Sequence, residues 1–197
     1  MNGKTHQLIG FTSSLAISTV VYQIGSVSLP ICATMIAGSC LGSYIPDMDH
    51  PGSTLGRKIG IISHPINLLS RLFMSVHNKT KGKISLKLGE IFAHRGIFHA
   101  PIFWTIIMGL LFWWLPGLTE IAIVSRSIFG ILIGISIGIG MHLIADMFNP
   151  TGIPILMPIV NKKVSLGKIV TGSKKEWIVI AGCILIIFCN IAYIFLQ

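Results

Sequence analysis

Five long apolar segments constrain the fold of this chain more than any other feature of its sequence. A helix that crosses a bilayer needs about 20 mostly apolar residues. Only 11% of the 197 residues are charged, against about 25% in soluble domains. The sequence therefore predicts one all-α membrane domain, residues 1–197: a polytopic helix bundle with about five transmembrane helices, four or six being the alternatives. The five segments are residues 8–27, 29–45, 101–115, 127–147 and 177–196.

The basic residues lie almost entirely on one side of this arrangement. Fourteen of the fifteen Lys and Arg residues precede the first segment or fall in the loops between the second and third and between the fourth and fifth; Arg126 is the exception. By the positive-inside rule that side is cytoplasmic, which predicts a cytoplasmic N-terminus and an external C-terminus. The net charge of +9 is then a topology signal that also attracts anionic membrane lipids, and we expect no nucleic-acid partner.

Residues 46–100 form a sizeable cytoplasmic loop between the second and third spans. Within it, residues 66–76 carry apolar side chains at helical spacing, which predicts an interfacial helix lying on the membrane; an ordinary helix packed on the bundle is the equal alternative. A basic, Gly-containing turn or hairpin is expected at residues 79–87. His64 and His77 bracket the helix, and we expect them to be interfacial rather than catalytic.

Four sequence-distant groups of His and Asp lie at the cytoplasmic ends of the predicted helices. His142 and Asp146 are four residues apart, so they share one helix face. Charge near a bilayer is costly unless it is paired or bound to metal, and all three aspartates of the chain belong to these groups. We therefore expect them to converge on one metal site. The candidate ligands are His6, Asp47, Asp49, His94, His99, His142 and Asp146.

Histidine with carboxylate is a usual ligand set for Zn²⁺, Mn²⁺ or Fe²⁺, so we expect a divalent metal, with zinc first. Seven candidates exceed the four ligands of one tetrahedral site, which leaves room for more than one ion. Two alternatives stay open: His6 as a polar residue at headgroup level, and Asp47 or Asp49 as caps of the following turn. Arg95 is expected either to pair with a carboxylate or to hold an anionic substrate group bidentately.

Three motifs in order, Pro46-Asp-Met-Asp-His50, His94-Arg-Gly-Ile-Phe-His99 and His142-Leu-Ile-Ala-Asp146, resemble those of the membrane-bound, metal-dependent hydrolase family of the YdjM-like, LexA-regulated inner-membrane type. The resemblance runs from Thr5 to about Pro158. It departs from the family pattern at Ala100, where a Ser is expected. The resemblance implies a multi-pass protein of the bacterial inner membrane with a hydrolase activity that needs a divalent metal.

The leading hypothesis is a hydrolase that acts on a lipid or lipid-linked phosphoester at the cytoplasmic face, with an amide or ester as the alternative bond. Metal binding lowers the pKa of a bound water toward about 7, and Asp49, His94 and Arg95 are the expected catalytic residues. The sequence contains no HExxH motif of zincin proteases and no GxSxG motif of serine hydrolases. One alternative is a metal-ion or proton-coupled transporter, whose site should lie near the bilayer midplane. The other is a non-catalytic protein with a coordinatively closed structural metal.

Overall fold

The computed structural model describes residues 1–115 and 122–196, and this part of the chain is almost wholly helical. A single pair of antiparallel two-residue strands, β1 and β2, interrupts it. The prediction of an all-α helix bundle is therefore confirmed. The elements are α1 (Gly3–Gln23), α2 (Leu29–Gly42), η1 (Ile45–Asp49), α3 (Thr54–Lys58), α4 (Gly60–Thr80), α5 (Lys83–Ile91), η2 (Ile97–His99), α6 (Pro101–Trp114), α7 (Ala122–Met147), β1 (Ile153–Pro154), β2 (Lys163–Val164) and α8 (Lys174–Phe195).

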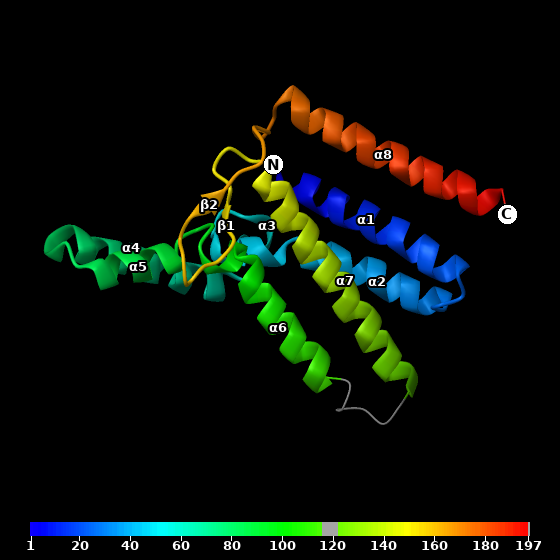
Figure 1. The fold of residues 1–197 in the computed structure, drawn as a ribbon, viewed down its shortest axis with the longest axis horizontal. Coiled ribbons are helices and arrows are strands. Elements are labelled where there is room, and N and C mark those ends of the chain that lie inside the picture. The colour runs from blue at the N-terminus through cyan, green and yellow to red at the C-terminus, as the bar shows by residue number, and fades with distance from the viewer. Residues whose placement is uncertain (116–121, 197) are drawn as a thin grey trace.

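Helices α1, α2 and α7 pack against one another, while α6 flanks α7 and α8 flanks α1 (Figure 1). Small residues bring α2 and α7 into backbone contact. A Cβ added at Gly134 or Gly138 of α7 would strike backbone atoms of α2 at Met35 and Ser39. Close approach through glycine is typical of membrane helix pairs. Gly134 and Gly138 thus face α2 and allow the two helices to pack closely.

Each of the five predicted segments contains a helix, but they differ in their capacity to cross a membrane. Among the described residues, the helices Leu29–Asp49, Val124–Met147 and Lys174–Phe195 are long and apolar enough to span it, and Pro101–Trp114 is apolar but shorter. Helix α1 has 21 residues but buries several hydroxyl side chains, so it is less apolar. The structure thus supports three spans by length and composition, and the remaining two crossings stay predictions.

Helices α4 and α5 form a hairpin, the α4–α5 arm, that projects beyond the end of the bundle (Figure 1). Ser70 Oγ donates a hydrogen bond of 2.9 Å to the carbonyl of Gly89, so α4 packs on α5 and not along the bundle. The predicted turn at residues 79–87 is wrong in extent. Lys81 ends α4 with a φ of 54°, and α5 begins at Lys83. The position of the turn is set by the left-handed backbone conformation of Lys81, which the periodicity of apolar residues does not predict.

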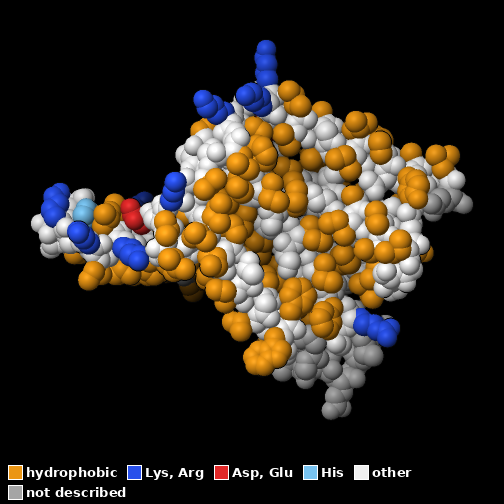
Figure 2. All heavy atoms as spheres, in the orientation of Figure 1, with side chains coloured by type: hydrophobic (Ala, Val, Ile, Leu, Met, Phe, Trp, Pro, Cys, Tyr) orange, Lys and Arg blue, Asp and Glu red, His pale blue; other side chains and the backbone are white. Residues whose placement is uncertain are grey.

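The surface separates apolar from basic side chains. Figure 2 shows apolar side chains over the bundle, with Lys and Arg gathered mainly on the α4–α5 arm and at the neighbouring end of the bundle. On the arm itself, Leu68 and Leu72 remain more than half exposed. Helix α8 runs from this basic end toward the opposite end, where the chain terminates (Figure 1). Which side of the membrane each end occupies remains a prediction.

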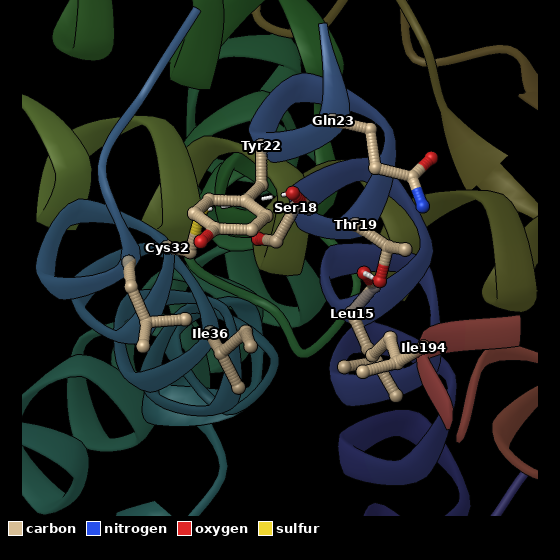
Figure 3. A pocket seen from close by; sticks show the side chains of 9 residues that line it. Leu15, Ser18, Thr19, Tyr22, Gln23, Cys32, Ile36 and Ile194 are labelled. Atoms are coloured by element: carbon tan, nitrogen blue, oxygen red, sulfur yellow. Dashed lines mark hydrogen bonds between the residues drawn. The ribbon is translucent and has the colours of Figure 1, made fainter. Parts of the chain in front are cut away.

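A cleft of about 240 Å³ opens between α1, α2 and the last turns of α8. Leu15, Ile36 and Ile194 line it together with Tyr22, and the Cys32 thiol donates to the Ser18 carbonyl at its wall (Figure 3). Its lining holds no histidine and no carboxylate. The cleft therefore offers no acid, base or metal ligand set, unlike the cluster of ionisable side chains described next.

Candidate metal centre

Four helix ends meet at the end of the bundle that carries the chain's N-terminus (Figure 1). They are the start of α1, the 3-10 turn η1 after α2, the segment 94–99 that ends in η2 before α6, and the last two turns of α7. The mutual packing of α1, α2 and α7 brings three of them together. All seven predicted ligands lie within this cluster, and they form three overlapping groups of facing donor atoms: His6, His142 and Asp146; Asp47, His99 and His142; Asp49, His94 and His99.

Asp146 lies at the centre of the cluster. Its Oδ1 is 3.5 Å from His6 Nε2, and its Oδ2 is 3.3 Å from His99 Nε2 and 3.8 Å from His142 Nε2. Its side chain is 2% exposed. One buried carboxylate therefore faces histidines from α1, η2 and α7.

The two aspartates of η1 face different histidines. Asp47 Oδ1 lies 3.3 Å from His99 Nε2 and 3.7 Å from His142 Nε2. Asp49 Oδ1 lies 3.1 Å from His94 Nδ1. The side chain of Asp49 is fully buried, whereas that of His94 is 36% exposed. The cluster is thus closed on the α1 and α7 side and open at His94.

His142 is oriented by a backbone carbonyl. Its Nδ1 donates a hydrogen bond of 2.7 Å to the Ser43 carbonyl, which leaves the lone pair of Nε2 directed at the aspartates. The ring of His6 stacks on it at 4.0 Å between centroids. A carbonyl on the far nitrogen is the usual support of a metal-bound histidine, because it sets the tautomer. Ser43 was not predicted, since a backbone acceptor leaves no mark in the side-chain pattern.

Several buried polar atoms of the cluster have no hydrogen-bond partner, which is costly at about 1–3 kcal/mol each. Neighbouring ligands of a tetrahedral ion with bonds of about 2.0–2.2 Å lie roughly 3.3–3.6 Å apart. The nitrogen–oxygen separations in this cluster run from 3.1 to 3.8 Å. The donor set and its spacing therefore fit a divalent cation. The unpartnered atoms are Nδ1 of His6, Oδ2 of Asp49, Nδ1 and Nε2 of His99, and Nε2 of His142.

His99 carries the positive charge that balances the aspartates. Burial lowers the pKa of His99, but the Asp146 and Asp47 carboxylates raise it by more, to about 9. The imidazole is thus protonated at neutral pH. A metal ion that binds such a histidine displaces its proton and takes over its role as countercharge.

Arg95 pairs with the central aspartate, one of the two roles expected for it. Its Nη2 donates to Asp146 Oδ1 at 3.1 Å, and its side chain is 15% exposed. The backbone of Arg95 has a φ of 60°, a left-handed conformation that is uncommon outside glycine and marks sites where strain is tolerated for function. A role in holding substrate stays a prediction.

The remaining histidines lie outside these ligand groups. His50 is exposed, with its ring 4.6 Å from that of His94. His64 is exposed on α4. His77 Nδ1 pairs with the Gly82 carbonyl at 2.9 Å, where it helps to close the arm.

Comparison with known proteins assigns the family. The family model described as "YdjM inner membrane protein" matches residues 1–197. The chain belongs to the YdjM family. This family is one of inner-membrane proteins, as the resemblance of the three motifs implied.

The relatives of this chain differ in how much of their length aligns with it. Uncharacterized protein YvsG of Bacillus subtilis is 27% identical over 182 residues, which cover 92% of this chain and 89% of YvsG. Inner membrane protein YdjM of Escherichia coli is 25% identical over 130 residues, 63% of this chain and 49% of that protein, and its Shigella flexneri counterpart matches equally. The chain thus aligns with about half the length of those two proteins. No solved structure matches it.

A buried carboxylate beside the cluster was missed by the sequence reasoning. Glu176 accepts hydrogen bonds from the Asn2 backbone at 2.6 Å, the Thr5 hydroxyl at 2.8 Å and the Gly172 backbone at 2.6 Å. Glu176 therefore joins the start of α8 to the first turn of helix α1, which carries His6. The spacing Ser173-Lys-Lys-Glu176 before an apolar run is a capping box, and that signal could have found it.

Replacement of Glu176 by Gln is expected to destabilise this YdjM-family protein. The glutamine amide keeps one oxygen that can accept hydrogen bonds. Its NH2 group replaces the other oxygen, so at least one of the three donors that bond to Glu176 would face another donor. Hydrogen bonds to charged groups contribute about 1.5–3 kcal/mol, so we expect the free energy of unfolding to fall by about 2 kcal/mol. Thermal unfolding of the purified protein in detergent measures it, with Glu90→Gln as the matched control. A melting temperature equal to that of the wild type would contradict this role.

Proposed function

We propose that this YdjM-family protein is a metal-dependent hydrolase embedded in the membrane, which acts on a lipid or lipid-linked phosphoester at the cytoplasmic face. One observation carries the proposal. Four histidines and three aspartates from four separate helix ends face one another, with five of their buried atoms unpartnered. A cluster of this kind is costly to maintain for packing alone. A metal ion bound through one nitrogen of each histidine would give part of these atoms a partner.

The proposed chemistry assigns a role to the metal ion and to each of three side chains. A bound divalent ion supplies Lewis acidity and water activation at neutral pH. Asp49, with one oxygen unpartnered, is placed to accept the proton of the attacking water, and His94 orients it from 3.1 Å. Arg95 can exchange its pairing with Asp146 for a phosphate oxygen, because guanidinium binds both anions.

The position of the cluster favours hydrolysis over transport. A transporter binds its ion near the bilayer midplane on interrupted helices. Here Asp49 ends the apolar stretch Leu29–Asp49, and Asp146 lies one residue from the end of α7. A site at the helix ends can be reached from the water and from lipid headgroups. It therefore suits a substrate with an apolar tail in the bilayer and a phosphate at its surface.

The exposure of His94 argues against a purely structural metal. Structural sites are coordinatively closed, while catalytic sites keep one position open. His6, His99 and His142 are almost fully buried, so they offer no approach. The exposed edge at His94 is where substrate can enter.

A hydrolysis screen tests the proposal. The purified protein in liposomes is expected to release phosphate or a headgroup from phospholipids or lipid-linked phosphates, to lose that activity with a chelator, and to regain it with Zn²⁺ or Mn²⁺. Asp49→Asn should lower the rate at least about 100-fold, as expected for loss of a general base. His64→Ala is the matched control on the exposed arm and should leave the rate unchanged. Turnover that persists in chelator would overturn the proposal.

A further inference from the structure

We infer that the centre binds two metal ions, with Asp47 between them, which deepens the proposed function and rests on its metal. Two of the three groups of facing ligands have no residue in common. One is made by His6, His142 and Asp146, and its atoms lie within 4.8 Å of one another. Each group alone has the three protein ligands that a catalytic ion uses.

The second group consists of Asp49, His94 and His99, again with ligand atoms within 4.8 Å of one another. Its Asp49 and His94 donors are 3.1 Å apart, the spacing of adjacent ligands on one ion. Asp49 Oδ2 remains without a partner. It stays available as the proton acceptor when Oδ1 binds an ion.

The third group connects the first two. It joins Asp47 to His142 of one set and to His99 of the other. Asp47 Oδ1 lies 3.3 Å from His99 Nε2 and 3.7 Å from His142 Nε2. A carboxylate between two ligand sets is placed to bridge two ions. Pairs of ions are common in enzymes that cleave phosphoesters, where they stabilise the attacking and the leaving oxygen.

The hydrogen bonds assign each histidine to one ion. His142 has only Nε2 to offer, because Nδ1 is bonded to the Ser43 carbonyl. One Nε2 binds one ion, and we place it in the set with His6, whose ring stacks on it, and Asp146. His99 Nε2 lies 3.3 Å from carboxylate oxygens of Asp47 and Asp146, and His99 also faces Asp49 and His94, so we place it in the second set.

The two sites differ in access to solvent. Every ligand of the first set is almost fully buried, with side chains 1–3% exposed. In the second set the His94 side chain is 36% exposed. The inner ion should therefore exchange slowly and the outer ion rapidly. A change at His6 or at His94, each of which pairs only within its own set, should remove one ion and leave the other.

Metal analysis tests this directly. Wild-type protein dialysed with Zn²⁺ should hold two ions per chain, and dilute chelator should remove one quickly and one slowly. His94→Ala should hold only the slow ion, and His6→Ala only the fast one. His64→Ala is the control and should hold two. With Mn²⁺, the paramagnetic resonance spectrum should show a coupled pair that Asp47→Asn weakens.

The outcomes separate this inference from the proposed function. If the wild type binds one ion per chain and its hydrolysis is sensitive to chelator, the two-ion inference is wrong and the proposed hydrolase function is retained. No bound ion in the wild type would overturn both. Should an alanine variant fail to fold, His94→Gln and His6→Gln keep a polar side chain of similar size, and the resonance spectrum of the wild type needs no variant. An uncoupled Mn²⁺ spectrum at two ions per chain would rule out Asp47 as the bridge.

Discussion

Replacement of Asp146 by Ala is expected to strip the centre of metal and abolish hydrolysis. Its two oxygens face His6 at 3.5 Å and His99 at 3.3 Å, so one substitution weakens the ligand set of each ion. It also leaves the Arg95 guanidinium without its partner. Loss of a group that merely supports a ligand costs 10–100-fold in metal affinity, and loss of this ligand should cost more than about 100-fold. Metal content after dialysis against limiting Zn²⁺ measures it.

Two controls separate charge from packing at this position. Asp146→Asn keeps the side-chain volume and removes the charge, so it should lose metal as the alanine variant does. Glu90→Gln removes a carboxylate of α5 that lies outside the ligand groups, and it should bind metal as the wild type does. Retention of the full metal content by Asp146→Ala would refute the central place given to this residue.

Replacement of Gly138 by Ala is expected to damage the fold and the centre together. The added Cβ would strike the Ser39 carbonyl oxygen and would lie 2.7 Å from the Ser43 backbone nitrogen. Overpacking of a tight contact costs typically 1–3 kcal/mol, and the displaced atoms here are backbone. Because the Ser43 carbonyl orients His142, metal affinity should fall as well. Thermal unfolding and metal titration in detergent measure the two effects.

The same helix offers a matched control. Gly140 lies two residues farther along α7, and a Cβ added there would meet nothing within 4 Å. Gly140→Ala should therefore leave the melting temperature equal or slightly raised, since alanine favours helix by about 1 kcal/mol over glycine. Equal melting temperatures for the Gly138 and Gly140 variants would show that the contact between α2 and α7 is looser than the structure has it.

Much of the fold could be predicted from single-residue properties. Apolar run length indicated the helices, because backbone groups in lipid must be satisfied within the helix. The ends were less accurate. Helix α1 begins at Gly3, ahead of the predicted residue 8, since the Asn2 side chain caps it. The α4–α5 arm was also misjudged, because its inner contacts, such as Ser70 with Gly89, join residues 19 apart.

For the candidate metal centre, too, part could be predicted from the sequence and part depended on the tertiary structure. By itself the sequence determined that the chain is a membrane helix bundle and that its histidines and aspartates gather at helix ends, because hydropathy and charge act on each segment independently. Only the tertiary structure decided that Asp146 faces three histidines, that the Ser43 carbonyl orients His142, and that Glu176 ties α8 to α1. These contacts depend on which helix faces which, and backbone packing through glycine settles that.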